Sequence, residues 1–325
     1  MSKAIRINAY GGPEVMTLVD VEVPAPGPGE VLIKQSACGL NFIDVYMRTG
    51  LYALPELPWG IGLEAAGTIE AVGNGVSDLG VGDRVAYITQ PPGAYAEARV
   101  MPVEKLVKLP DAINDKTAAG MMLKGLTAQY LLRRTYNVKP GDTILMHAAA
   151  GGVGLIVCQW AKHLGATVIG TVGSEEKAAL ARAHGCDHTI LYREENFKDR
   201  VRDITDGAGV NVVYDAIGKD TFMDSLDSLK PLGTMVTFGN ASGPVPAIEP
   251  GILGAKGSLY LTRPTIFTHI ATRAGLVEMT DDLFSVVSNG HVKIEVRQEY
   301  ALADAVQAHT DLEARKTTGS TVLIP

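Results

Sequence analysis

The chain has 325 residues, which at roughly 150 residues per domain indicates about two domains. Apolar residues make up 46% and charged residues 20%, which excludes a disordered chain because enough apolar surface is available to offset the ordering entropy. The formal charge of −7 comes from 29 basic and 36 acidic residues, and without basic clusters it argues against nucleic acid or an anionic membrane as the main partner.

The cysteines and the N-terminus bear on the compartment. Cys38, Cys158 and Cys186 are odd in number and far apart, so neither a disulfide framework nor a Cys-x-x-Cys metal pair is available. The N-terminus lacks the apolar segment of a signal peptide, and the longest apolar run, residues 144–158, is too short to span a membrane. We therefore expect a cytoplasmic protein.

The first part of the chain, up to about residue 120, has the pattern of a β-rich domain. Short runs of strand-forming residues are separated by Gly, Pro and Asp, as in a small barrel or sandwich. The expected strands are residues 31–34, 67–72, 84–87 and 106–109.

From about Thr117 the pattern changes to alternating strands and helices. Residues 117–135 predict a helix, and six strand candidates then follow at residues 143–147, 167–172, 188–191, 210–215, 234–238 and 258–261. Helices are expected between them at residues 154–164, 174–184, 197–205 and 221–228. Such alternation predicts a doubly wound parallel sheet. The tail predicts helices at 274–289 and 301–314 and a last strand at 320–324.

The strongest local signal is a glycine turn between a strand and a helix. Gly151, Gly152, Val153 and Gly154 follow the strand at 143–147, with alanine at position 148 where such turns carry their first glycine. A strand, a glycine turn and a helix direct main-chain N–H groups and the positive helix end at one point, which suits a pyrophosphate. The sequence therefore predicts a dinucleotide site, the alternative being a tight turn without a ligand.

The end of the second strand indicates which dinucleotide binds. An NAD site usually has an acid there for the ribose 2′-hydroxyl, but this chain has Gly173 followed by Ser174, with Lys177 one turn further along. Tyr192, after the third strand, can close the pocket. Hydroxyl and ammonium donors suit a 2′-phosphate, so the sequence favours NADP over NAD.

Short motifs spread along nearly the whole chain form a specific set. They are residues 11–15 (GGPEV), 39–46 (GLNFIDVY), 62–67 (GLEAAG), 81–85 (VGDRV), 123–128 (LKGLTA), the turn at 148–159 and residues 261–264 (LTRP). Together they resemble those of the zinc-independent quinone oxidoreductases, the zeta-crystallin-like branch of the medium-chain dehydrogenase/reductase superfamily. The similarity is greatest to bacterial NADPH:quinone oxidoreductases.

This resemblance implies an α/β protein of two domains. A GroES-like β-rich catalytic domain would comprise residues 1–124, with the C-terminal tail 265–325 returning to it. Residues 125–264 would form the Rossmann-type NADP-binding domain with its six-stranded parallel sheet, and the cofactor would lie in the cleft. The resemblance also implies a homodimer joined through the last strand of that sheet, near residues 258–261.

Zinc is where the chain departs from the wider superfamily. Zinc alcohol dehydrogenases place a cysteine ligand after a Gly-x pair and a histidine between Gly and Glu, and here Asn41 and Leu63 occupy these positions. Leucine cannot bind zinc and a neutral amide rarely does. We expect no metal, and a substrate that accepts hydride without a Lewis acid, such as a quinone. Cys38, close to the first position, is expected in the core.

Candidate site residues follow from the resemblance. Asn41 and Tyr46 would line the nicotinamide and the substrate and are the catalytic candidates, acting through hydrogen bonds. Further cofactor contacts would come from Thr127, Gly151, Gly152, Val153, Gly154, Gly173, Ser174, Lys177, Tyr192, Phe238, Gly239 and Arg263. Asn41 is equally well explained as the cap of a helix over residues 42–48, in which Asp44 and Arg48 would pair. Lys124 is either a cation of the site or an ion-pair partner, and His147 is expected to be a core histidine.

Three functions compete at this point. The first is an NADPH-dependent quinone reductase that transfers hydride without zinc. The second is an NADPH-dependent enone or enoyl (2-alkenal) reductase, which calls for a proton donor, with Tyr46 as the only obvious candidate. The third is a non-enzymatic dinucleotide-binding or RNA-associated protein, against which the negative charge argues.

Overall fold

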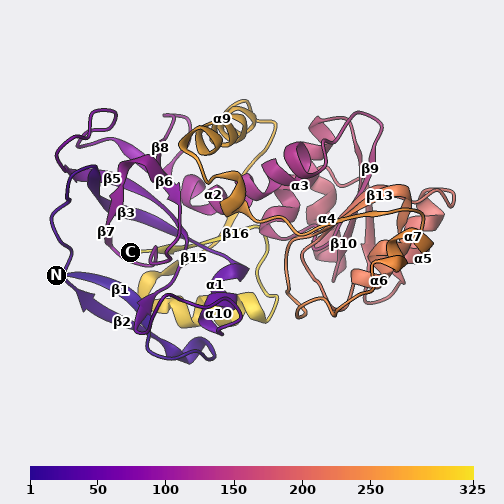
Figure 1. Cartoon of the computed structure of the whole chain (residues 1–325), viewed down its shortest axis with the longest axis horizontal. Coiled ribbons are helices and arrows are strands. Elements are labelled where there is room, and N and C mark those ends of the chain that lie inside the picture. The colour runs from indigo at the N-terminus through magenta and orange to yellow at the C-terminus, as the bar shows by residue number, and fades with distance from the viewer. The chain divides into compact units, whose positions relative to one another are not determined.

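The computed structural model describes all residues, 1–325. Backbone contacts divide the chain into two compact units (Figure 1). The first unit comprises Met1–Leu126, Ile270–Ser288 and Ile294–Pro325, and the second comprises Thr127–His269 and Asn289–Lys293. None of the helices combines the length and the apolar composition that crossing a lipid bilayer requires.

Two sheets form most of the first unit. One has the strand order β15-β16-β3-β5-β6-β8, with β7 also paired to β3, and the other has the order β2-β1-β4. The strands are β1 Ser2–Ile7, β2 Met16–Val21, β3 Glu30–Leu40, β4 Trp59–Gly60, β5 Glu64–Val72, β6 Arg84–Ile88, β7 Ala98–Pro102, β8 Leu106–Lys108, β15 Val296–Ala301 and β16 Ser320–Ile324. Buried Val31 and Ile33 alternate with exposed Lys34 along β3, the period-2 pattern of a strand with one face in the core.

The C-terminal segment is part of this first unit. β16 pairs antiparallel with β3, where Thr321 lies opposite Leu40 and Leu323 opposite Cys38. The Ser320 hydroxyl donates a hydrogen bond to the Gly120 carbonyl at 2.7 Å. The last strand of the chain is therefore joined to the longest strand of the N-terminal part.

The helices of the first unit connect and cover these strands. They are α1 Phe42–Arg48, α2 Asp115–Tyr130, α9 Arg273–Ser288 and α10 Ala305–Glu313, with 3₁₀ turns at Pro13–Val15, Val103–Lys105 and Leu302–Asp304. The boundary between the units falls inside α2, after Leu126. Ala118, Met122 and Leu126 of α2 are fully buried, which explains its apolar composition.

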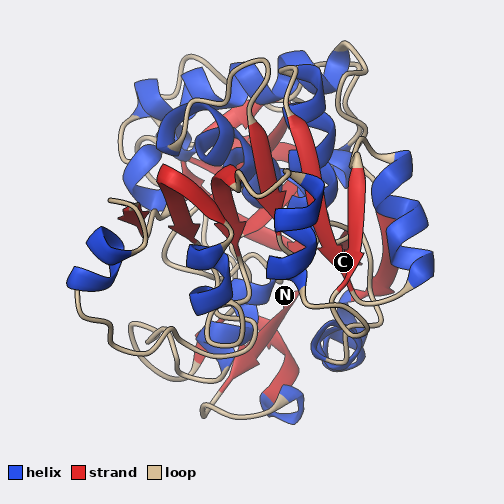
Figure 2. Ribbon diagram, turned by 90° about the vertical axis from the view of Figure 1, so that its right-hand side faces the viewer, coloured by secondary structure: helices blue, strands red, loops and turns tan.

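The second unit is built on a six-stranded parallel sheet (Figure 2) with the order β11-β10-β9-β12-β13-β14. Counted within the unit this is 3-2-1-4-5-6, the doubly wound order that places ligands at the carboxyl ends of the strands. The strands are β9 Thr143–Met146, β10 Thr167–Val172, β11 His188–Leu191, β12 Val210–Asp215, β13 Leu229–Thr237 and β14 Tyr260–Thr262. Leu145, Ile169, Val213 and Met235, from four of these strands, share one core.

Helices follow the strands of this sheet in turn. They are α3 Gly152–His163, α4 Glu175–Ala183, α5 Phe197–Ile204, α6 Phe222–Asp227, α7 Gly251–Ala255 and α8 Ile266–His269. Figure 2 shows the strands side by side with helices around them. The fold class predicted from the sequence, a GroES-like β domain and a Rossmann-type domain, is confirmed.

Several predicted boundaries were wrong. The last strand of the parallel sheet begins at Tyr260 and not at Ser258, because Ser258 has φ 56° and cannot continue a strand. The helix predicted at 117–135 ends at Tyr130 and continues as a π-helical turn over Leu131–Thr135. The tail helix predicted from residue 301 begins at Ala305, after β15 and a 3₁₀ turn.

Candidate functional site

The predicted glycine turn joins β9 to α3. Gly151 is the N-cap of α3 with an extended backbone, and the N–H of Leu155 bonds back to the Gly151 carbonyl at 2.9 Å. The N–H groups of Gly152, Val153 and Gly154 precede this bond and lie at the positive end of the helix. Such an end binds phosphate groups without a charged side chain.

Close packing explains the small residues of this turn. A Cβ on Gly154 would lie 2.3 Å from the Ala148 oxygen and 2.6 Å from the Ala149 oxygen. Ala148 has φ 54°, in the left-handed region that favours glycine, so the chain adopts the conformation of the usual glycine despite the alanine. This narrow main-chain cradle fits the pyrophosphate of a dinucleotide.

The end of β10 also has the features expected of an NADP site. A Cβ on Gly173 would lie 2.9 Å from the Tyr192 hydroxyl, so the structure brings these two predicted residues together. Ser174 caps α4, with its hydroxyl accepting from the Lys177 N–H at 3.4 Å. An acidic side chain at position 173 would press on Tyr192, and the hydroxyl groups present instead fit a 2′-phosphate.

The acids that follow this strand do not occupy the same place. The Glu175 carboxylate pairs with Arg182 on its own helix, and its side chain is 69% exposed. Glu176 is exposed as well. The charge of Glu175 is therefore offset by Arg182 on the same helix.

Other predicted cofactor residues lie where β13 and β14 end. The Phe238 N–H donates to the Asp215 carbonyl at 2.8 Å, and a Cβ on Gly239 would lie 2.3 Å from the Ala216 oxygen. Arg263, just after β14, donates from Nη1 to the Gly239 carbonyl at 3.4 Å, which joins two predicted residues. Thr127 is buried within α2.

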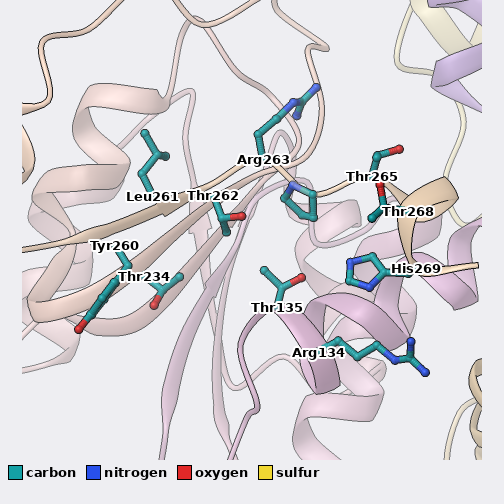
Figure 3. Close-up of a pocket in the computed structure, with 11 residues that line it drawn as sticks. Arg134, Thr135, Thr234, Tyr260, Leu261, Thr262, Arg263, Thr265, Thr268 and His269 are labelled. Atoms are coloured by element: carbon teal, nitrogen blue, oxygen red, sulfur yellow. The ribbon is translucent and has the colours of Figure 1, made fainter. Parts of the chain in front are cut away.

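A cavity of about 670 Å³ lies beside β14 (Figure 3). It is lined by Arg134, Thr135, Thr234, Tyr260, Leu261, Thr262, Arg263, Pro264, Thr265, Thr268 and His269. Arg263 alone among the predicted site residues lines it, and Figure 3 shows its guanidinium directed away from that of Arg134. This cavity is therefore distinct from the glycine turn.

In the first unit, Asn41 lies at the start of α1 and its side chain contacts a buried acid. It is the N-cap residue of α1 and is 5% exposed. Its side chain, however, donates from Nδ2 to Glu64 Oε1 at 2.7 Å. Glu64 Oε1 also accepts from Lys124 Nζ at 3.2 Å, so Lys124 is an ion-pair partner. The Asn41 amide is thus oriented by a buried carboxylate.

Tyr46 lies in an aromatic cluster on and after α1. Its ring centroid is 5.9 Å from that of Phe42 and 5.4 Å from that of Tyr52. Phe42 and Tyr52 are only half-buried, whereas Tyr46 is buried. The cluster presents aromatic rings of a kind that pack against another flat ring.

The pair expected between Asp44 and Arg48 was wrong. Arg48 instead forms an ion pair with Glu313 at 2.9 Å, and Asp44 Oδ2 accepts from the Tyr95 hydroxyl at 2.8 Å. Asp44 and Arg48 lie on the same short helix, but each interacts with a residue of another element. The sequence contained no local signal for these partners, because Tyr95 and Glu313 lie far away along the chain.

Two residues considered in the sequence belong to the core, as expected. His147 is 1% exposed and its two ring nitrogens lie 2.9 Å from the hydroxyls of Thr171 and Ser225. Burial lowers the pKa of His147 below its usual value. Cys38 is fully buried, and burial raises the pKa of its thiol to about 12.

Both parts of the chain match known protein families. Residues 27–111 match the family model of the alcohol dehydrogenase GroES-like domain, and residues 152–279 match that of the zinc-binding dehydrogenases. The quinone oxidoreductase of Pseudomonas aeruginosa is 56% identical over 325 residues, which is 100% of each chain. The chain belongs to the quinone oxidoreductase family.

Two further relatives of the family bear on ligands. The crystal structure of Escherichia coli quinone oxidoreductase complexed with NADPH superposes with a TM-score of 0.97 at 48% identity, covering 99% of this chain and 100% of that one. The 2-haloacrylate reductase of a Burkholderia species is 46% identical and covers 100% of this chain and 99% of its own.

Proposed function

We propose that the protein is an NADPH-dependent quinone reductase that transfers hydride without zinc. The observation that carries this proposal is the combination of a glycine turn and an acid-free β10 end in a chain related over its full length to quinone oxidoreductases. The NADPH bound to one of these relatives supports the same cofactor here.

NADPH, when bound, supplies the hydride from its nicotinamide ring. The N–H groups of residues 152–154 would hold its pyrophosphate, and Ser174, Lys177 and Tyr192 would surround its 2′-phosphate. We assign further cofactor contacts to Thr127, Gly151, Gly173, Phe238, Gly239 and Arg263.

Asn41 and Tyr46 are proposed to serve the quinone. Glu64 occupies one N–H of the Asn41 amide, and the second N–H of this group can donate to a quinone oxygen as negative charge develops there. The half-buried rings of Phe42 and Tyr52 beside Tyr46 suit a flat acceptor. Reduction to the hydroquinone also takes up one proton, which we assign to solvent water.

The proposal of a metal-free mechanism rests on the side chains that this protein has at the two positions where zinc enzymes carry metal ligands. Leu63 is fully buried and carries no donor atom, and the Asn41 amide is bound to Glu64. No group of three or more His, Cys, Asp or Glu side chains is arranged to hold a metal ion. Metal analysis of active protein tests this point: stoichiometric zinc would overturn it.

We propose a homodimer through β14, which corresponds to the strand expected near residues 258–261. β14 pairs only with β13, so its other edge is open. Tyr260 is 60% and Leu261 37% exposed on this strand. A second copy added at this edge would continue the sheet. Sedimentation should give twice the chain mass of 34.4 kDa, and a monomer at micromolar concentration would contradict the proposal.

The cytoplasm remains the proposed compartment. All three cysteines are buried and unpaired, which accords with a reducing environment. Fractionation of the source cell, with an antibody to the protein, is the direct test.

The second candidate function is reduction of an activated C=C bond. The relative named 2-haloacrylate reductase favours it, because its name describes such a substrate. Steady-state NADPH oxidation should be measured with quinones, alkenals, enoyl thioesters and 2-haloacrylates under the same conditions. We expect the largest kcat/KM with a quinone. Activity confined to alkenes would replace the quinone reductase by this alternative.

Tyr46→Phe separates the two candidates further. A quinone needs only a hydrogen bond from Tyr46, so its reduction should slow by less than about threefold. An alkene needs a proton at carbon, and loss of a general acid would slow its reduction by about a hundredfold or more.

A further inference from the structure

A chain of buried polar side chains links the C-terminal helix to α1 within the first unit. Arg48 is fully buried and binds both carboxylate oxygens of Glu313 on α10, each at 2.9 Å. Arg48 Nη1 also lies 3.0 Å from His309 Nδ1. On the other side of the ring, His309 Nε2 lies 3.2 Å from the Tyr95 hydroxyl.

This series of hydrogen bonds ends at the start of α1. The Tyr95 hydroxyl lies 2.8 Å from Asp44 Oδ2, and the same oxygen accepts the main-chain N–H of Asn41 at 2.9 Å. Asp44 and Tyr95 are 0% and 1% exposed. The last residue in the series is therefore Asn41, whose side chain is one of the two catalytic candidates.

Arg48 fixes the direction of every bond in this chain. A guanidinium can only donate, so His309 Nδ1 must accept and carries no proton. The proton of the neutral ring is then on Nε2, which donates to the Tyr95 oxygen. Tyr95 in turn can donate only to Asp44 Oδ2. One arrangement of hydrogens satisfies all four groups, and burial together with Arg48 lowers the pKa of His309 to about 3.

Asp44 is the titratable end of the chain. Burial raises its pKa to about 7, and the negative charge of Glu64 acts in the same direction. The hydrogen bonds from Tyr95 and Asn41 and the charge of Lys124 oppose that rise. Asp44 Oδ1 is buried without a hydrogen-bond partner, whereas Oδ2 accepts from both the Tyr95 hydroxyl and the Asn41 N–H, and two such bonds favour the carboxylate. The ionised form is the one that this geometry can hold in place.

Buried polar side chains are not needed merely to pack α1 against the rest of the first unit. Apolar side chains of the same volume would pack the helix without the cost of desolvating two charged groups and an imidazole. The hydrogen-bonded side chains have a further effect, because they hold Asp44 Oδ2 in a fixed position as the acceptor for the main-chain N–H of Asn41. The main chain of Asn41 is thus held by Asp44, and its side-chain amide is oriented by the Glu64–Lys124 pair.

We propose that His309 and Tyr95 are positioning residues for the hydride transfer, and that they act through Asp44 to fix Asn41 in its productive orientation. Neither residue touches the substrate in this proposal. The inference rests on the proposed quinone reduction, and it assigns a function in that reaction to the C-terminal helix α10.

Tyr95→Phe is the direct test. It removes the hydroxyl that links His309 to Asp44 and keeps the ring. We expect kcat with a quinone to fall about tenfold or more, with KM for NADPH unchanged. Activity should fall at acid pH as Asp44 is protonated. Because the Tyr95 bond lowers the pKa of Asp44, its loss should move this acid limb to higher pH.

Tyr300→Phe is the matched control. Tyr300 also donates to an aspartate, Asp311 on the same helix α10, at 3.0 Å. The control should leave kcat and the acid limb unchanged. The proposal is overturned if Tyr95→Phe behaves like Tyr300→Phe, or if both variants lose only thermal stability. A wild-type protein that reduces no acceptor would defeat the proposed function instead.

A measurement without turnover decides the case if Tyr95→Phe does not fold. The chain has seven histidines, and ¹⁵N NMR of histidine-labelled wild-type protein, assigned with His309→Gln, reports their tautomers. His309 should remain neutral with its proton on Nε2 from pH 8 to about pH 4. Titration near the ordinary histidine pKa of about 6.5, or a proton on Nδ1, would refute the chain of bonds.

Discussion

The two units hold their candidate site residues by different physical means. In the second unit, the phosphate-binding groups are main-chain N–H groups of consecutive residues, 152–154, and their position depends on a local turn. In the first unit, Asn41 is held by Glu64 and Asp44, which depend in turn on Lys124 and Tyr95. One site is built from backbone, and the other from buried side chains distant in sequence.

This difference predicts different sensitivities. A main-chain site tolerates changes of side chain unless they alter the backbone path. A buried polar network is intolerant, because removing one partner leaves another group desolvated and unpaired. Variants in the first unit should therefore cost the most stability, and variants at the turn should weaken ligand binding only where they alter the backbone path.

The largest effect is expected for Lys124→Met. The substitution leaves the Glu64 carboxylate, 0% exposed, without its cation, and the free energy of unfolding should fall by about 3–5 kcal/mol. Urea denaturation measures it. Lys116→Met is the control, since Lys116 and Glu299 are about half exposed and their pair should contribute less than about 1 kcal/mol.

The double variant Lys124→Met/Glu64→Gln sharpens this prediction. Removing the charge of Glu64 as well should restore most of the lost stability, because no uncompensated charge remains. A double variant as unstable as the single one would show that packing, and not charge, dominates at this pair.

Gly154→Ala should have the next largest effect. Its Cβ would lie 2.3 Å from the Ala148 oxygen, so α3 must move away from the turn. We expect a loss of stability of about 1–3 kcal/mol and a weaker NADPH affinity by about tenfold, measured by calorimetry. Gly251→Ala, where a Cβ meets nothing within 4 Å, is the control in the same unit. Equal effects of the two would contradict the close-packing argument.

Lys177→Ala tests the choice between the two dinucleotides. Loss of an ammonium group near the 2′-phosphate should weaken NADPH binding about tenfold and leave NADH binding unchanged. Lys162→Ala, a change at an exposed lysine paired with Asp187 on the same unit, should alter neither. Unchanged NADPH affinity in Lys177→Ala would refute the assigned 2′-phosphate site.

The same contrast explains what the sequence could predict. The parallel strands of the second unit are short apolar runs followed by turn residues, so their order and the glycine turn are visible locally. Among the strands that were not predicted, β1 (SKAIRI) and β15 (VRQEYA) contain neither an apolar run nor a strict alternation of polar and apolar residues. β3 extends to Leu40 through polar and small residues, since its neighbours β5 and β16 supply hydrogen bonds to that part of the strand.

The side-chain network of the first unit could not be predicted from local sequence patterns. Tyr95 and His309 are 214 positions apart, and nothing near either residue marks it as a partner of the other. Asp44 and Arg48 have the spacing of a helical ion pair, yet each is drawn to a partner from another element. Tertiary contacts override a weak local preference of this kind.

The smallest expected effect is that of Ala148→Gly, and it has the opposite sign. The left-handed conformation of Ala148 costs about 1–2 kcal/mol, which glycine avoids, while glycine loses about 0.4–1 kcal/mol more in chain entropy. The variant should therefore be more stable by about 0.5–1 kcal/mol. Ala149→Gly, at the neighbouring buried position, gains no such relief and should be less stable. NADPH affinity should stay unchanged in Ala148→Gly, because the N–H groups that bind phosphate belong to residues 152–154. If both variants are destabilised, the main-chain site depends on side chains more than the comparison of the two units allows.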